Sequence, residues 1–396
     1  MPFAPSEVMM WADESAGFAR KMSDYDINAK YSARELRIVT ESNREQLPNF
    51  VAALKRPEWL RLQPFYQRRK RWDIRRKSKL IESFIMNVPI PPCFLYESEL
   101  ARYEVMDGQQ RISTVFDFYE DKFKLVGLDQ WPELNERKYS TLPSEIRKGL
   151  DRRSISYIVL LKESAKTNTE EMLLRQQVFE RLNTGGVQLE SQEVRHCVYY
   201  GSFDRLLYDL AKHQAMRKAW GLPPYDPSEE AEPPETLLSN PHFSKMRDSE
   251  FVLRFFALRH REHYRGGMKP FLDQYMVRSR KFSDNDIEML ENLFVDTIDL
   301  AENIYGEQLF KPWVEKHKRH ARIPQVAFAD AVMVGLSEYV GHRTKLLERR
   351  AQIAASTDKM VTESPQGTFT GKGNSKAAIQ LRVGLFDAML REVLAN

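Results

Sequence analysis

The period of the hydrophobic pattern changes at Asp107 and Gly108, and this change limits the folds open to the first half of the chain. Before the pair, Tyr103 and Val105 alternate with Glu104 and Met106, as in a short half-buried strand. After the pair, apolar residues recur with the spacing of one helix face, at Ile112, Val115, Phe116 and Tyr119. The sequence therefore predicts a strand that passes through an Asp-Gly turn directly into a helix.

The remaining patterns predict an α+β fold, with a mixed domain followed by an all-α domain. Up to about residue 220, strands are expected at "ELRIVT", "CFLY" and "SISYIVLL", and helices near 44–54, 75–86, 170–182, 190–200 and 203–219. The stretch "LPPYDPSEEAEPPE" is rich in proline and acidic residues, which indicates a linker or exposed loop. Four helical patterns follow, interrupted by a polar stretch near 355–376. The expected divisions are an N-terminal extension 1–44, a mixed domain 45–220, a linker 221–248 and a helical domain 249–396.

Composition excludes several classes of protein. A chain of 396 residues with 42% hydrophobic and 29% charged residues is that of an ordinary globular protein, and a net charge of +4 confines any nucleic-acid contact to local patches. The only cysteines are Cys93 and Cys197, which argues against a disulfide scaffold or a multi-cysteine zinc site. The N-terminus lacks a signal-peptide pattern, and no apolar run is long enough to span a bilayer. We therefore expect a cytoplasmic protein without a membrane segment.

Three stretches of the mixed domain are candidates to meet at the Asp107 turn. "FYQRRKRWDIRRKSK" (65–79) has eight lysines or arginines against one aspartate, and "FERLNTGGVQLESQEVR" (179–195) ends a helix in a glycine pair. Arginines can hold phosphate oxygens bidentately, helix N-termini attract anions, and Asp107 could hold a Mg²⁺ ion that also binds phosphate oxygens. Together these features suit a nucleoside triphosphate.

Each of these stretches also has a purely structural explanation. Asp107 can serve as a helix cap within an Asp-Gly turn, the basic run can be a solvated helix face, and "NTGG" can be a helix C-cap. The chain has no P-loop sequence, so general motifs give nucleotide binding no support. At this level the residues leave both interpretations open.

Four motifs together resemble a known family. "YQRRKRW", "LIESFIMNVPIPPCFLY", "VMDGQQRISTVFDFY" and "FERLNTGGVQLESQEV" occur in this order, and they resemble the N-terminal domain of GmrSD-type restriction systems, which is similar to the ParB/sulfiredoxin fold. The resemblance covers roughly residues 45–215. "LRFFALRHR" and "FADAVMVGLSEY" resemble the helical half found behind this domain in relatives.

The resemblance implies a nucleotide-hydrolysing regulatory domain that acts in defence against phage with modified DNA. The motif from Asp107 to Arg111 is then the nucleotide site. Within it, the catalytic residues are expected to be Asp107, Gln110 and Arg111, with Asp107 also the Mg²⁺ ligand. The nucleotide-binding residues are expected to be Gln67, Arg68, Gly108, Gln109, Thr114, Asn183 and Gly186. One departure is Glu190, at a position where the family usually has a small hydroxyl residue, and Ser191 is the candidate to replace it.

A second departure concerns the nuclease. Many relatives carry a C-terminal His-Asn-His nuclease domain, and this chain lacks its pattern. The pairs His260/His263 and His317/His320 lie among lysines and arginines, which disfavours a metal ion, so we expect solvated or phosphate-facing surface there. The cutting activity is therefore expected in a separate subunit.

The leading hypothesis is an NTPase (GTP, ATP or CTP) that serves as the regulatory subunit of a modification-dependent restriction system. The alternatives are a nucleotide-gated DNA-binding switch, as in ParB-like clamps, and a structural adaptor with a degenerate pocket. The expected partners are DNA, a separate nuclease subunit and a second copy of the chain. The DNA contacts are expected from the basic residues Arg69, Arg71, Arg75, Arg76, Lys318 and Arg319.

Overall fold

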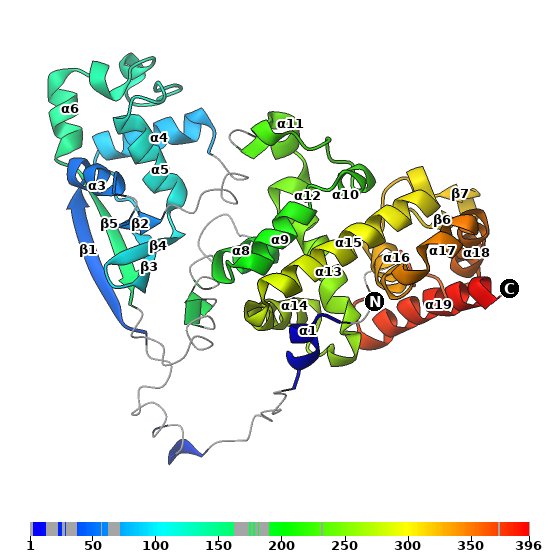
Figure 1. Ribbon diagram of the computed structural model, residues 1–396. Helices are drawn as coiled ribbons and strands as arrows, with labels where there is room; N and C mark the ends of the chain where they lie inside the picture. Colours follow the sequence, from blue (N-terminus) through cyan, green and yellow to red (C-terminus); the bar gives the residue numbers. More distant parts are fainter. Residues whose placement is uncertain are drawn as a thin grey trace. The chain divides into compact units, whose positions relative to one another are not determined.

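The computed structural model consists of two compact units (Figure 1). It describes residues 3–12, 23–25, 28, 38–56, 58–61, 72–161, 174–175, 177–178, 181, 190–230, 233–370 and 373–395. The sheet unit comprises residues 18–188, and the helical unit comprises residues 1–17 together with 189–396. The chain therefore starts in the helical unit, builds the sheet unit, and then returns.

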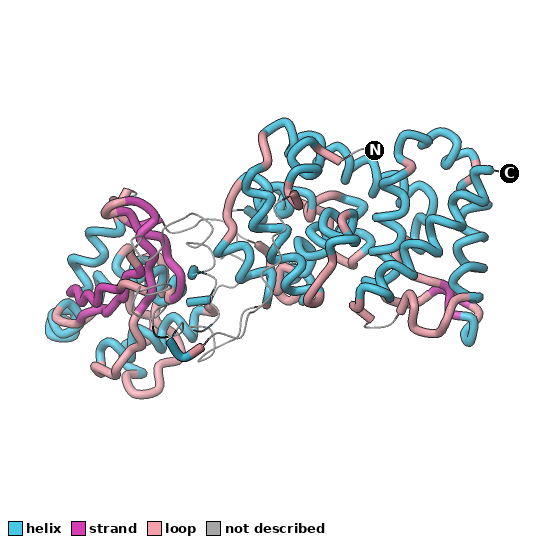
Figure 2. Tube along the Cα trace, turned by 90° about the horizontal axis from the view of Figure 1, so that it is seen from below, coloured by secondary structure: helices cyan, strands magenta, loops and turns pink. Residues whose placement is uncertain are grey.

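The sheet unit is built on a mixed sheet of five strands in the order β1-β5-β3-β4-β2. Its described elements are β1 (Thr40–Gln46), α3 (Leu47–Leu54), β2 (Leu60–Arg61), α4 (Ile74–Ile85), β3 (Cys93–Glu99), β4 (Arg102–Asp107), α5 (Gln109–Tyr119), α6 (Ser144–Asp151) and β5 (Ser154–Leu160). β1 and β5 are antiparallel, as are β3 and β4, whereas β5 is parallel to β3 and β2 is parallel to β4. Figure 2 shows the strands in magenta beside the helices of this unit.

The core of the sheet unit lies between the sheet and the helices α3, α4 and α5. Ile81 of α4 is fully buried. On α5, Ile112 and Val115 are fully buried as expected, but Phe118 is the third fully buried apolar residue, whereas Phe116 and Tyr119 are only half-buried. Asp73 caps α4 because its carboxylate accepts the Arg76 N–H at 2.8 Å. The α5 helix was therefore predicted correctly as an element, but its buried face includes Phe118 in place of Phe116 and Tyr119. Its N-terminus lies where β4 ends.

The first strand differs from the prediction. We expected it at the apolar segment "ELRIVT", followed by a helix from about residue 44, but β1 spans Thr40–Gln46 and α3 begins only at Leu47. Six of the seven β1 residues are exposed. Because β1 is an edge strand, paired only with β5, polar residues are tolerated there, and hydrophobic alternation could not reveal it.

The helical unit contains the helical patterns seen in the sequence together with helices that the patterns did not reveal. Its described helices are α1 (Pro5–Met9), α8 (Ser191–Val198), α9 (Ser202–Leu210), α10 (Gln214–Ala219), α11 (Glu235–Leu238), α12 (Pro241–Ser244), α13 (Arg247–Arg259), α14 (Met268–Arg278), α15 (Asp284–Tyr305), α16 (Val326–Glu338), α17 (Arg343–Glu348), α18 (Arg350–Glu363) and α19 (Lys376–Ala395). The expected single helix 203–219 is two helices, α9 and α10. The polar stretch near 355–376 is helical as far as Glu363, because Ile353, Thr357 and Met360 of α18 are buried.

The segment 3–12 docks onto the helical unit through a buried carboxylate. Glu7 is fully buried and accepts hydrogen bonds from Arg259 Nη1 at 3.0 Å and from the Tyr275 hydroxyl at 3.0 Å, and His260 Nε2 lies 3.0 Å from the same carboxylate. Trp11 stacks on His263 with ring centroids 4.6 Å apart. His260 and His263, two of the four histidines expected on a solvated or phosphate-facing surface, are therefore anchors for the N-terminal segment, which was expected to be only an extension.

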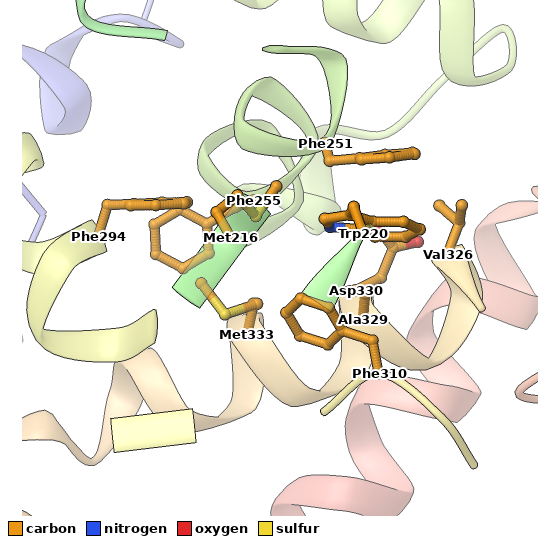
Figure 3. A pocket seen from close by; sticks show the side chains of 10 residues that line it. All are labelled: Met216, Trp220, Phe251, Phe255, Phe294, Phe310, Val326, Ala329, Asp330 and Met333. Atoms are coloured by element: carbon orange, nitrogen blue, oxygen red, sulfur yellow. The ribbon is translucent and has the colours of Figure 1, made fainter. Parts of the chain in front are cut away.

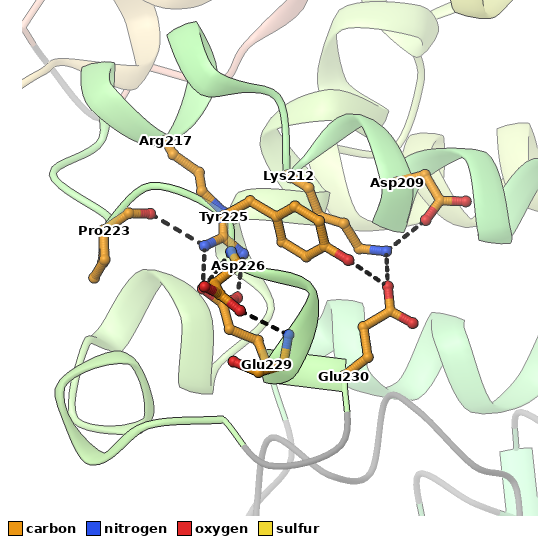
Figure 4. Close-up of polar contacts among 9 residues, drawn as sticks. Asp209, Lys212, Arg217, Pro223, Tyr225, Asp226, Glu229 and Glu230 are labelled. Atoms are coloured by element: carbon orange, nitrogen blue, oxygen red, sulfur yellow. Dashed lines mark hydrogen bonds and ion pairs between the residues drawn. The ribbon is translucent and has the colours of Figure 1, made fainter.

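The expected linker 221–248 is folded rather than extended. Arg217 holds Glu229 in a buried bidentate ion pair with N–O distances of 2.9 and 2.8 Å, and Lys212 pairs with Glu230 at 2.7 Å (Figure 4). Farther on, Leu237 and Phe243 are buried. Glu229 and Glu230, which suggested solvation, instead pair with Arg217 of α10 and with Lys212, which lies between α9 and α10. The division between the units falls at residues 188 and 189 rather than near residue 220.

Candidate nucleotide site

The Asp107 turn has the geometry that the sequence predicts, and it depends on glycine. β4 ends at Asp107, Gly108 adopts φ +94°, and α5 begins at Gln109. A Cβ atom at Gly108 would lie 2.5 Å from Cys93 Sγ and 2.9 Å from Cys93 Cβ. Glycine is therefore required twice, for its left-handed backbone and for the close approach of β3.

Cys93 lies directly against this turn, at the start of β3. It is fully buried, and burial raises the pKa of its thiol to about 12. A thiol with such a high pKa stays protonated at neutral pH and is a poor nucleophile. Cys93 thus has a packing role at the turn, and sequence reasoning did not connect it with the site.

The guanidinium group of Arg111 is held by acceptors of its own chain. Its Nη2 lies 2.5 Å from Asp107 Oδ2, and its Nη1 donates to the carbonyl of Pro91 and, at 3.3 Å, to that of Pro92. The Arg111 side chain is 13% exposed, whereas the Asp107 carboxylate is 52% exposed. Arg111 therefore joins the "VPIPP" segment to the turn, and its charge is partly balanced by Asp107.

The two glutamines of the motif occupy the first turn of α5, where backbone N–H groups have no acceptor inside the helix. The Gln110 side-chain oxygen accepts the Trp72 N–H at 3.1 Å. The middle of the basic stretch 65–79, at Trp72, thus does meet the first turn of α5, as the sequence suggested. Pro91 and Pro92 belong to the proline run directly before β3, and sequence reasoning did not connect this run with the site.

Thr114 is not placed to bind a nucleotide. It is fully buried, and its hydroxyl has no hydrogen-bond partner among the residues that the structure describes. Four further expected site residues lie outside the described residues: Gln67, Arg68, Asn183 and Gly186. Glu190 is the residue directly before α8, and its side chain pairs with Lys245 at 2.8 Å. Ser191 is the first residue of α8 and does not take the cap position expected for it.

The basic residues expected to contact DNA fall into two places. Arg75 and Arg76 are exposed on the first turn of α4, while Arg69 and Arg71 lie outside the described residues. Lys318 and Arg319 are exposed on a short hairpin formed by β6 (Trp313–Val314) and β7 (Arg319–His320). From residue 311 to 322 this hairpin has five lysines or arginines and one glutamate, a net +4 that equals the net charge of the whole chain. The hairpin is thus a concentrated positive patch.

Metal ligands and enclosed cavities are scarce in the parts of the chain that the structure describes. These residues contain no cluster of three or more histidines, cysteines, aspartates or glutamates that could hold a metal ion. An apolar cavity in the helical unit has a volume of about 20 Å³ and is closed by Trp220 stacked on Phe251 (Figure 3). It has room for about one water molecule, and not for a nucleotide.

Comparison with known proteins gives one match. Residues 52–200 match the family described as GmrSD restriction endonuclease, N-terminal domain. No curated protein and no solved structure matches the chain. The matched segment contains the Asp107 turn and its partners, and it is a member of the GmrSD N-terminal domain family. The chain thus carries a restriction-system domain.

The remainder of the chain adds a helical region to this domain. In the described part of the chain, no helix is long and apolar enough to cross a membrane.

Proposed function

We propose that this protein is the NTP-binding and NTP-hydrolysing regulatory subunit of a modification-dependent anti-phage restriction system, with the nuclease supplied by a partner in the cytoplasm. The observation that supports this proposal best is the Asp107–Arg111 turn, which lies within the matched family domain and opens the 11-residue helix α5. The sheet unit is then a ParB/sulfiredoxin-like domain. The nucleotide phosphates bind at the first turn of α5, because its N–H groups and dipole favour anions.

Catalysis in this proposal consists mainly of positioning the nucleotide and the attacking water and of stabilising the charge on the terminal phosphoryl group as it is transferred to water. Gln110 orients a phosphate oxygen or water, and Asp107 is the one carboxylate of the motif available to a Mg²⁺ ion. The Asp107 carboxylate is paired with Arg111, so a Mg²⁺ ion would have to compete with Arg111 for it. Arg111 contributes by fixing the turn and the segment before β3, and Mg²⁺ would supply the positive charge that phosphoryl transfer needs.

The alternative is a nucleotide-gated DNA-binding switch in which turnover is incidental. The engagement of Arg111 by two carbonyls and Asp107 supports this alternative, because a guanidinium so occupied is not poised to clamp a phosphate. The exposed β6–β7 hairpin of the helical unit, and separately Arg75 and Arg76 of the sheet unit, would then be the DNA contacts.

Phosphate release separates the two functions. The purified chain should release phosphate from GTP, ATP or CTP in proportion to protein concentration and only with Mg²⁺. A Gln110→Ala variant should lose most of this turnover and keep its melting temperature to within a few degrees. Nucleotide binding without phosphate release would support the switch, and the absence of both would contradict the whole proposal.

DNA binding is tested by its salt dependence. If the hairpin and α4 together contact about six phosphates, the logarithm of affinity should fall with the logarithm of salt with a slope near −5. Changing Lys318 and Arg319 together to Gln should reduce that slope by about 2. Absence of a complex at low salt, with plain and with modified duplex, would refute a DNA partner.

A further inference from the structure

The sheet unit contains a hollow that shares no residue with the Asp107 turn. It lies where α3 meets β1 and β5 and has a volume of about 370 Å³. Small residues of α3, Ala52 and Ala53, leave it open on one side. Its other lining residues are Glu45, Asn49, Arg56, Trp59 and Tyr157.

Two aromatic rings form a fixed wall of this hollow. Trp59 and Tyr157 are half-buried and meet at 82°, with ring centroids 6.3 Å apart. Phe50 lies behind both of them, 5.7 Å from Trp59 and 5.8 Å from Tyr157. The rings are therefore held by the core while one side of each faces the hollow, where it can cover an aliphatic chain or a cation.

The polar side chains that line the hollow are accessible, since Asn49 and Arg56 are exposed and Glu45 is half-buried. Among the described residues, the side chains of Glu45, Asn49 and Arg56 make no hydrogen bond or ion pair, although Glu45 and Arg56 carry opposite charges and line the same hollow. Burial, followed by the charge of Glu45, raises the pKa of Tyr157 to about 12, so its hydroxyl remains a donor. This arrangement contrasts with the Asp107 turn, where charged groups already satisfy one another.

The edge strand supports a ligand role for these groups. Asn43 and Glu45 lie on the same face of β1, since side chains alternate along a strand, and Asn43 is paired with Tyr157 of β5. On β5 this face also carries Ile155, which is in the core. Glu45 is the one residue of β1 that is half-buried rather than exposed, and it lies on this face beside the hollow.

The separation of the two charges sets the shape of a ligand. Glu45 precedes and Arg56 follows α3, and this helix of eight residues is about 12 Å long. We propose that the hollow binds a molecule with an ammonium group at one end and a carboxylate at the other, joined by an aliphatic chain. This is the chemistry of lysine, either as a small amino acid or as the C-terminal residue of a polypeptide. The ammonium meets Glu45, the chain covers Trp59 and Tyr157, and the carboxylate meets Arg56 bidentately.

The test is calorimetric titration of the full chain with ε-aminocaproate, with n-hexylamine and hexanoate as matched ligands that lack one charge. We expect ε-aminocaproate to bind and each single-charge ligand to bind about tenfold more weakly or not at all. Glu45→Gln and Arg56→Gln should each weaken ε-aminocaproate about tenfold, whereas Arg44→Gln, on the other face of β1, should leave its affinity unchanged.

A second titration identifies the source of the ligand. A peptide ending in lysine, the same peptide with an amidated C-terminus, and free lysine are compared. Tighter binding of the free-acid peptide than of free lysine indicates a polypeptide end, and equal binding indicates a small amino acid. The Asp107→Asn variant should bind ε-aminocaproate as the unchanged protein does, because the two sites share no residue. No binding of ε-aminocaproate at millimolar concentration, or equal binding by n-hexylamine, would overturn the proposal.

Discussion

Replacing Arg111 by alanine should loosen the junction between the Asp107 turn and the segment before β3. The variant loses the donors to the carbonyls of Pro91 and Pro92 and the ion pair with Asp107. The ion pair contributes at most about 1 kcal/mol because Asp107 is half exposed, whereas hydrogen bonds from a charged donor contribute roughly 1.5–3 kcal/mol. We therefore expect a loss of about 2–3 kcal/mol in local stability.

Hydrogen exchange measured by mass spectrometry can detect this loss. Amides in peptides that cover β3 and the first turn of α5 should exchange about 30- to 150-fold faster in Arg111→Ala, since 1.4 kcal/mol corresponds to a factor of ten. Peptides from α15 and α19 should be unchanged and serve as internal references.

The matched control is Arg102→Ala, at the other end of β4. Arg102 pairs with Glu99 at 2.9 Å, but both side chains are more than half exposed, at 56% and 65%. Its removal should change stability by less than about 0.5 kcal/mol. Arg111→Lys should be intermediate, because lysine can keep one of the contacts but not all three. Exchange in Arg111→Ala no faster than in Arg102→Ala would refute the role assigned to the guanidinium.

Gly108→Ala should lower the free energy of unfolding of the sheet unit by about 3 kcal/mol or more, since a Cβ would collide with Cys93. The control is Gly127→Ala, because Gly127 has φ +62° but a Cβ there would have its nearest contact at 3.6 Å, and it should cost only about 1–2 kcal/mol. Urea unfolding of both variants measures the difference. Asp107→Asn should retain the melting temperature, because asparagine can still accept from Arg111, and should lose Mg²⁺-dependent turnover; normal turnover would remove Asp107 from the proposed catalytic residues. Burial acts to raise the pKa of Glu7, but the His260 hydrogen bond and the Arg259 charge outweigh it and hold this pKa below its usual 4.5. Docking of segment 3–12 should therefore be fully present above about pH 4.5 and weaken as the pH falls further, which limited proteolysis in this segment would show; equal protection at pH 3 and pH 7 would contradict it.

The fold around the Asp107 turn was predictable because several local signals agree there. The period change, the Asp-Gly pair and the buried face of α5 all indicate the same strand, turn and helix, and the structure has all three. The contact between the basic stretch and the turn was also expected, and the Gln110–Trp72 hydrogen bond provides it. Local patterns could not show the orientation of Arg111, because its acceptors are backbone carbonyls about twenty residues away. Every residue has a backbone carbonyl, so the sequence does not distinguish those that accept a hydrogen bond.

Other parts of the chain were mispredicted because charged residues were assumed to face solvent. Glu229 suggested a linker, but it is buried against Arg217. Glu7 lies in a helix of five residues, too short to show a period, and its partners are more than 250 positions away. In each case a buried ion pair replaced the hydrophobic contact that pattern analysis can detect.

The docking of segment 3–12 has a consequence for synthesis on the ribosome. Glu7 is synthesised 252 positions before its partner Arg259. At translation rates of 5–20 residues per second, the segment waits on the order of 10–50 s for its binding surface, while the complete sheet unit leaves the ribosome in between. Segment 3–12 therefore cannot dock until the part of the helical unit that carries Arg259 has emerged, so its docking follows the synthesis of the sheet unit.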